Sequence, residues 1–214
     1  PNLDPFLIVG GSHLLPEVRT IDDIIEKRLV AAEVPMQHSG YYGCAEDVRS
    51  VARGIDGCIR AFEEITPDVV IVLGDRIEAF AAASAASIGG YTLAHIHGGD
   101  RAEGVADEAI RHAITKLAHI HFPATPDSAA RIQKMGEHPE TIFMVGSPAA
   151  DGINDIAPIH NAEYEELGSP RTIFLMHGTG SADDEDYTTA KTVIEACITS
   201  GSVLALTPNT DPGG

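Results

Sequence analysis

The sequence is poor in cysteine and has no long apolar run. Its three cysteines, Cys44, Cys58 and Cys197, leave an odd count and form no CxxC pair, so the sequence predicts neither a disulfide framework nor a zinc cluster. We expect them to be small core or partly buried residues. No apolar stretch approaches the roughly 18 residues of a membrane span, and no signal-peptide pattern opens the chain. These absences predict a soluble, cytoplasmic protein.

Basic residues are also scarce. The chain has 14 Lys and Arg against 32 Asp and Glu, which gives a formal net charge of -18. Such a charge repels phosphate backbones and anionic membranes, so we expect neither a nucleic acid nor a membrane as partner. An acidic composition with few lysines is typical of a high-salt habitat or simply of a soluble acidic surface, and composition leaves both open.

A length of 214 residues, 43% of them hydrophobic, suffices for one large domain or two small ones. Residues 151–170 have weak periodicity and several prolines and glycines, so we expect a connection between a first domain over 1–150 and the start of a second over 171–214. The chain begins without methionine almost directly on a predicted strand and ends in a turn-rich loop. We therefore expect a fragment.

Apolar runs and helix-forming stretches alternate along the chain, which predicts an α/β fold. We expect strands at 6–9, 68–73, 91–97, 120–122, 141–145, 171–176 and 202–206. We expect helices at 21–29, with Thr20 as N-cap, and at 45–65, 77–86, 126–135 and 184–200.

The most informative stretch is a strand, a helix and a second strand, each strand followed by ionisable residues. The strand at 68–73 is followed by Gly74-Asp75-Arg76, and the strand at 91–97 runs into His97-Gly98-Gly99-Asp100. Both read as buried strands, and the alanine-rich helix between them is long enough to make the strands parallel. Asp75 and His97 should then meet at the edge where open α/β sheets bind ligands.

Several motifs together resemble the UDP-N-acetylglucosamine 2-epimerase family, specifically its hydrolysing branch. They are Gly74-Asp75-Arg76, His95-Ile96-His97-Gly98-Gly99-Asp100, Glu103-Gly104, the run from Asp107 to Lys116, His121-Phe122 and Val145-Gly146-Ser147-Pro148. The resemblance runs from Gly11 to Asp211. It implies a GT-B type fold of two Rossmann-like, doubly wound domains, with the first strand of the first domain missing and the second domain only partly present.

The chemistry that the resemblance implies begins with loss of UDP from C1 and of a proton from C2 of a UDP-2-acetamido sugar. The resulting 2-acetamidoglucal adds water and releases the free 2-epimer, such as N-acetylmannosamine. Proton removal needs a positioned carboxylate or imidazole, and the leaving diphosphate needs cations or helix N-termini. The resemblance implies no cofactor and no metal.

The catalytic residues that the resemblance implies are Asp75, His97, Asp100, Asp107 and His177. Asp75 has the alternative of a turn residue after a strand, and Asp107 that of a simple charge at a helix N-terminus. His177 is a candidate cation near the leaving phosphate, although Gly178-Thr179-Gly180-Ser181 departs from the sequence usual in the family.

His97 departs from many relatives, which carry glutamate there. Either His97 itself or Asp100 could serve as the base. Histidine at this position is familiar from a subgroup that includes enzymes acting on UDP-N,N'-diacetylbacillosamine, so it could report substrate choice.

Four further residues fall on positions that the family uses for sugar, phosphate or uridine contacts: His13, Arg76, Gly146 and Asn209. We expect His95, Gly99 and Arg111 to bind the substrate as well. Arg111 lies four residues after Asp107, so the two share a helix face and could form an ion pair that orients the aspartate.

Competing hypotheses remain open. His95, His97 and Asp100 could be metal ligands of a hydrolase, because His95 and His97 point the same way from a strand. Within nucleotide-sugar chemistry, the chain could belong to a hydrolysing 2-epimerase, to a non-hydrolysing epimerase or glycosyltransferase-like enzyme, or to a non-catalytic binding module. We expect a UDP-sugar as ligand and a homo-oligomer, dimer or tetramer.

Overall fold

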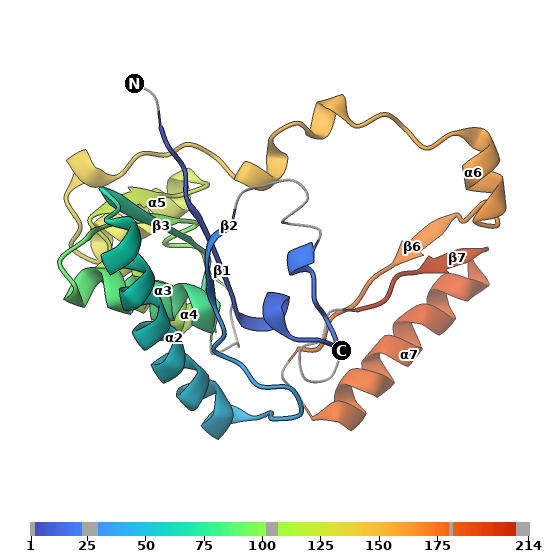
Figure 1. The fold of residues 1–214 in the computed structure, drawn as a ribbon. Coiled ribbons are helices and arrows are strands. Elements are labelled where there is room, and N and C mark those ends of the chain that lie inside the picture. The colour runs from blue at the N-terminus through green and yellow to red at the C-terminus, as the bar shows by residue number, and fades with distance from the viewer. Residues whose placement is uncertain (1–2, 23–29, 102–106, 180–181, 209–214) are drawn as a thin grey trace. The chain divides into compact units, whose positions relative to one another are not determined.

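The computed structural model describes residues 3–22, 30–101, 107–179 and 182–208, without the side chains of Asp107 and Asp183. The chain forms two compact units, Pro1–Ala150 and Asp151–Gly214 (Figure 1). Every strand pairing in both units is parallel among the described residues, and helices alternate with the strands. The α/β fold predicted from the sequence is confirmed.

The centre of the first unit is the sheet β3-β4-β5, formed by Val69–Leu73, Thr92–Ile96 and Ile120–Phe122. Its strands are connected by α3 (Ile77–Ile88) and α4 (Asp107–Leu117). The register sets Val72 beside His95 and His95 beside His121. The predicted strand, helix and parallel strand are confirmed, so the loops after β3 and β4 share one edge of the sheet.

Three helices cover one face of this sheet. α2 (Cys44–Ile65) and α3 pack closely because Gly54 of α2 leaves room for Ala81; a Cβ on Gly54 would lie 2.8 Å from the Ala81 Cβ. Side chains of α2, α3 and α4 form one core with β3 and β4, and Phe62, Leu93 and Ile114 are among its members. Four of the alanines of α3, Ala81, Ala83, Ala85 and Ala86, are buried here, in line with close packing of helix on sheet.

The opposite face of β3 departs from the prediction of a buried strand. Val70 and Val72 are buried beneath the helices, but Val69, Ile71 and Leu73 are 41%, 61% and 56% exposed. Described helices cover β3 on one side only, whereas parallel strands are usually covered on both.

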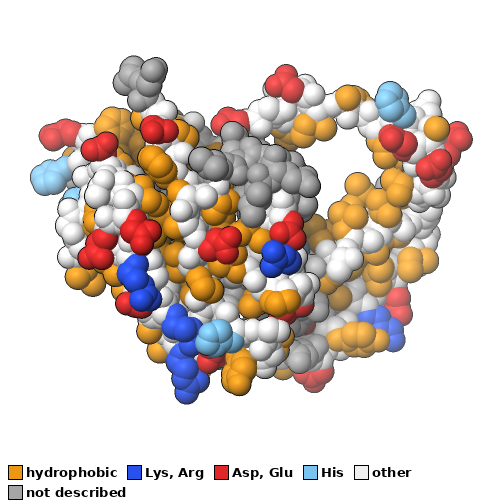
Figure 2. Space-filling model, viewed as in Figure 1, with side chains coloured by type: hydrophobic (Ala, Val, Ile, Leu, Met, Phe, Trp, Pro, Cys, Tyr) orange, Lys and Arg blue, Asp and Glu red, His pale blue; other side chains and the backbone are white. Residues whose placement is uncertain are grey.

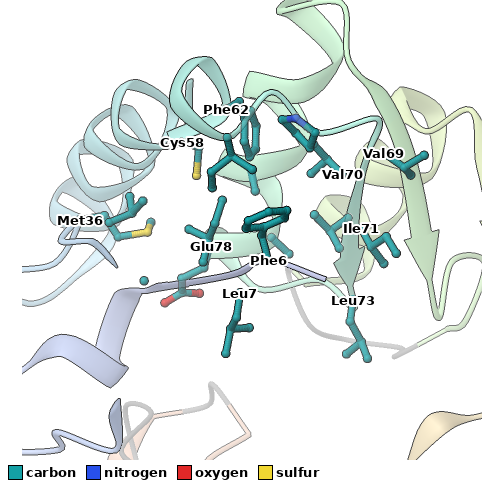
Figure 3. A pocket seen from close by; sticks show the side chains of 18 residues that line it. Phe6, Leu7, Met36, Cys58, Phe62, Val69, Val70, Ile71, Leu73 and Glu78 are labelled. Atoms are coloured by element: carbon teal, nitrogen blue, oxygen red, sulfur yellow. The ribbon is translucent and has the colours of Figure 1, made fainter. Parts of the chain in front are cut away.

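A second pair of strands, β1 (Leu7–Gly10) and β2 (Val30–Val34), forms a separate sheet among the described residues. β1 matches the predicted strand, and β2 was not predicted. An apolar cavity of about 300 Å³ lies between β1 and β3, and side chains of α2 and α3 also line it (Figure 3). Glu78, at the start of α3, is the charged member of its lining.

The predicted strand at 141–145 is wrong. Ile142 makes one bridge to His121, and the Phe143 amide donates to the His121 carbonyl, but residues 141–145 form no strand. The next bond of a parallel ladder would need an amide N–H at Pro123, which proline lacks. The predicted helix at 21–29 is described only for Ile21 and Asp22; the remainder lies outside the described residues.

The rest of the first unit includes α5 (Pro126–Lys134), whose N-cap Thr125 accepts from the Ser128 amide at 3.1 Å. The second unit contains the short helix α6 (Asn161–Glu166), then β6 (Thr172–Phe174), α7 (Asp183–Thr199) and β7 (Val203–Ala205), with β6 and β7 paired in parallel. No described helix is long and apolar enough to cross a membrane.

The cysteines are free in the structure. Cys58 is buried and Cys197 is partly buried, as predicted, and burial raises the pKa of the Cys58 thiol to about 11. Cys44 is exposed at the start of α2, so the expectation of at least partial burial is wrong there.

Candidate active site

Ionisable side chains gather at the carboxyl ends of β3 and β4, in the segments 74–76 and 97–101. Gly74 has a φ of +78°, which turns the chain out of β3, and its amide donates to the Ile96 carbonyl of β4 at 3.0 Å. The two loops are therefore fixed to each other through the backbone. The predicted meeting of Asp75 and His97 at one edge of the sheet follows from this arrangement.

His97 lies at the centre of a polar chain. Its Nδ1 is 2.8 Å from Asp100 Oδ2, and its Nε2 is 2.9 Å from the hydroxyl of Ser147. The backbone of His97 is left-handed, with φ +63°. Such a conformation costs about 1–2 kcal/mol in a residue with a Cβ and persists only where surrounding contacts hold it.

Asp100 uses both of its carboxylate oxygens. Oδ2 faces His97, and Oδ1 accepts from the hydroxyl of Ser128 at the start of α5. Burial acts to raise the pKa of Asp100, but hydrogen bonds from Ser128 and His97 together outweigh it, so the pKa is lowered. Asp100 is consequently ionised at neutral pH and accepts a hydrogen bond from the Nδ1–H group of His97.

Asp75 is paired with Arg111. The Arg111 guanidinium of α4 donates to Asp75 Oδ2, and both side chains are largely buried, with 14% of Arg111 and 17% of Asp75 exposed. Arg111 Nε is buried without a hydrogen-bond partner among the described residues. The guanidinium thus orients Asp75 and keeps one further donor within the site.

His95 is fully buried beneath these residues. Its Nε2 donates to the Gly74 carbonyl at 2.8 Å, and its Nδ1 lies 3.2 Å from the Thr115 hydroxyl of α4. Burial lowers the pKa of His95 to about 4, so the ring is neutral. This placement favours a role in holding the Gly74 turn over direct contact with a ligand.

The two glycines after His97 are required by packing. A Cβ on Gly98 would lie 2.9 Å from His95 Nδ1, and one on Gly99 would lie 2.4 Å from the Ser128 carbonyl oxygen. Gly99 also has φ +77°, and its carbonyl accepts from Arg131 of α5. These close contacts set α5, and with it Ser128, against the loop that carries Asp100.

Asp107 is the first residue of α4, as predicted, and its side chain lies outside the described part of the structure. The predicted ion pair of Arg111 with Asp107 therefore stays a prediction. The partner that the structure gives Arg111 is Asp75, on the neighbouring strand end.

The other predicted ligand contacts are more dispersed. His13 is exposed in the 3-10 turn Gly11–Leu14, with Nδ1 2.5 Å from the Thr20 hydroxyl. Arg76 is the N-cap residue of α3 and is half exposed; its Nε lies 3.7 Å from Glu78 Oε2. Gly146 has φ +86° and precedes Ser147. Asn209 lies outside the described residues.

His177 belongs to the second unit, where it follows β6 and is exposed. The loop after it is tied to α7, because Thr179 donates from its amide and its hydroxyl to the Asp186 carboxylate, at 2.9 and 2.6 Å. The unusual Gly178-Thr179 sequence therefore has a local structural use, which is to anchor this loop.

Sequence reasoning missed Ser128 and Ser147, which bind Asp100 and His97. The N-cap pattern Thr125-Pro126 just before Ser128 marks the start of a helix and is the sequence signal that could have indicated it. Ser147 belongs to the motif Val145-Gly146-Ser147-Pro148. Neither side chain could be assigned from spacing alone because each lies 28 or more residues from its partner. Among the described residues, no group of three or more His, Cys, Asp or Glu side chains could hold a metal ion.

Comparison with known proteins decides the family. The family described as UDP-N-acetylglucosamine 2-epimerase matches residues 1–211. The chain belongs to this family. A curated relative, the UDP-N,N'-diacetylbacillosamine 2-epimerase (hydrolyzing) of Legionella pneumophila, is 38% identical over 172 residues, which is 78% of this chain and 45% of the relative. The UDP-N-acetylglucosamine 2-epimerase of Neisseria meningitidis serogroup B is 28% identical over all of this chain and 57% of its own.

Among solved structures, the UDP-GlcNAc 2-epimerase of Methanocaldococcus jannaschii in complex with UDP-GlcNAc and UDP matches with a TM-score of 0.71 and 17% identity. The match covers 96% of this chain and 66% of that one. This likeness confirms the fold expected for a 2-epimerase of GT-B type. The chain spans about half the length of the curated relatives it matches.

Proposed function

We propose that this chain carries the acid–base site of a hydrolysing 2-epimerase that acts on a UDP-2-acetamido sugar. The observation that carries the proposal is the ordered pair His97–Asp100 beside the pair Asp75–Arg111, at one sheet edge of a chain from this family. Both pairs place a proton-transfer group against a fixed partner, which is what removal of a weakly acidic C2 proton requires.

In this proposal His97 is the base and Asp100 orients it. With the Nδ1–H group donating a hydrogen bond to the Asp100 carboxylate, the neutral ring has its lone pair on Nε2, which takes the C2 proton of the sugar. The C2–H electrons form the C1=C2 bond of the 2-acetamidoglucal, and the C1–O bond breaks with its electrons on UDP. The imidazolium that forms is stabilised by the ionised Asp100 carboxylate.

Water then adds across the double bond, with hydroxide at C1 and a proton at C2 from the opposite face. We assign this step to Asp107 or Asp75, whose carboxylate would take a proton from the water as its hydroxide adds to C1 and pass it to C2; Asp107 begins α4, and Asp75 is held by Arg111. Arg76 and His177 are the proposed cations for the leaving diphosphate, and His13, His95, Gly99, Gly146 and Asn209 stay predicted contributors to the substrate site.

The hydrolysing relative from Legionella pneumophila favours a specific second substrate, UDP-N,N'-diacetylbacillosamine. Product analysis tests the proposal with this sugar nucleotide and with UDP-N-acetylglucosamine, each separated by ion-exchange chromatography after incubation with the protein. Free sugar plus UDP supports a hydrolysing epimerase. An epimerised nucleotide-sugar indicates the non-hydrolysing reaction, and unchanged ligand with measurable binding indicates a binding module.

A further inference from the structure

Ser147 lies in this site but has no role in the proton transfers proposed above. It follows Gly146 and precedes the 3-10 turn Pro148–Ala150, fifty residues along the chain from His97. Its hydroxyl lies 2.9 Å from His97 Nε2, the nitrogen that the proposed function assigns to proton transfer. Ser147 is partly buried, so this contact forms at the edge of the site and not in the core.

The neighbouring hydrogen bonds fix the direction of this contact. Asp100 accepts at His97 Nδ1, so the neutral imidazole has an unprotonated Nε2 that can only accept. The Ala149 amide lies 3.3 Å from Ser147 Oγ and uses an oxygen lone pair, which leaves the hydroxyl proton free to point at His97. Ser147 therefore donates to Nε2 when the ring is neutral.

We propose that Ser147 is a positioning residue for His97: its hydroxyl donates to Nε2 and holds the ring before the sugar binds, then turns away so that the Nε2 lone pair can take the C2 proton. A hydroxyl changes from donor to acceptor by rotation about one bond, so it can afterwards accept from the imidazolium. Asp100 holds the ring at Nδ1 only, and Ser147 holds it at Nε2. The kinetic part of this inference rests on the proposed function.

The alternative is that Ser147 only caps the turn Pro148–Ala150. The direct test is nitrogen NMR of protein labelled with ¹⁵N-histidine, in which a His97→Asn variant identifies His97 among the ten histidines. We expect wild-type His97 to be protonated at Nδ1, with an Nε2 resonance shifted upfield by hydrogen bonding. Ser147→Ala should move that resonance downfield toward an unbonded value, and Ser147→Thr should restore it.

Kinetics with the same variants tests the consequence for the reaction, using UDP-N-acetylglucosamine and UDP-N,N'-diacetylbacillosamine as substrates. Ser147→Ala should lower kcat about 10-fold or more with KM within about 2-fold, because only proton transfer is impaired. Ser147→Thr should recover most of kcat. Thr141→Ala is the matched control, since it removes a turn hydrogen bond to the His138 carbonyl in the same segment and should leave both readouts unchanged.

Two results would overturn the inference. An unchanged His97 nitrogen spectrum in Ser147→Ala would show that the hydroxyl does not hold the ring, whatever the enzyme does. A shifted spectrum with unaltered kcat would show that the contact has no part in turnover. If the wild-type protein turns over neither sugar nucleotide, the proposed function fails, and the nitrogen spectrum still decides whether Ser147 positions His97.

Discussion

His97 combines a left-handed backbone with a ring whose two nitrogens both have partners. The sequence left open whether His97 or Asp100 stands in for the glutamate of other relatives. Asp100 accepts hydrogen bonds at both oxygens, from His97 and Ser128, which favours it as the residue that orients the ring. Nε2 of His97 faces away from Asp100, toward the Ser147 hydroxyl, which favours this nitrogen as the base. This arrangement is the residue-scale reason for proposing His97 as the base.

Asp107 is predicted to act in proton transfer. Asp107→Asn should leave UDP-sugar binding within about 3-fold but reduce turnover at least ~100-fold, as loss of an acid–base group usually does. Calorimetric binding and product release measured on the same preparation check both halves. Turnover equal to wild type would remove Asp107 from the mechanism and leave it as an N-terminal helix charge.

Arg111 is predicted to stabilise the first unit through Asp75. Arg111→Gln should lower the free energy of unfolding by about 1–3 kcal/mol, because it removes a charged hydrogen bond from a largely buried carboxylate. Arg60→Gln is the matched control, since its partner Asp56 and Arg60 itself are 63% and 68% exposed, and the loss there should stay below ~1 kcal/mol. Equal losses in urea unfolding would mean that burial of the Asp75 pair contributes nothing.

At the scale of elements, the sheet edge could be predicted because the strand and helix lengths around it leave one parallel arrangement. That no strand forms at 141–145 could not be predicted from those residues alone, since Pro123, just after β5, ends the pairing. β2 was missed because Val30–Val34 contains two alanines and a glutamate and has only a weak apolar alternation. The polar chain from Ser128 to Ser147 depends on contacts between distant segments, which no local pattern encodes.

The contact between the 97–101 loop and α5 predicts a large effect at Gly99. Gly99→Ala should destabilise the protein by more than Gly90→Ala, because both glycines have φ near +78° but only Gly99 has a neighbour in the way. The Gly90 substitution should cost about 1–2 kcal/mol for its backbone alone. Thermal unfolding of the two variants measures the difference, and equal losses would show that the loop yields without cost.

Burial of His95 between β4 and α4 predicts a pH dependence of stability. Its folded pKa of about 4 lies below the unfolded value of about 6.5, so the unfolded state binds the extra proton. This contribution is complete above pH 6.5 and is lost, by on the order of 1–3 kcal/mol, as the pH falls toward 4. Urea unfolding between pH 7.5 and 5 should show a smaller loss in His95→Gln than in the exposed control His138→Gln; equal slopes would contradict the assignment.

At the scale of the whole molecule, the net charge is -18, and both units contain many acidic residues. Figure 2 shows acidic side chains distributed over the visible face, with apolar and basic side chains between them. Such a face offers a phosphate group no broad attraction, so the proposed UDP-sugar site relies on local donors such as Arg76 and Arg111. The apolar cavity beside β3 contains neither of these arginines in its lining.

We propose that His97 removes the C2 proton before a free sugar is released. NMR of the products formed in deuterated water from UDP-N-acetylglucosamine and, separately, from UDP-N,N'-diacetylbacillosamine is the decisive measurement. We expect a free 2-epimer that carries deuterium at C2, together with UDP, from one of the two. Free sugar that retains its original C2 hydrogen, or intact nucleotide-sugar without exchange from both, would contradict it.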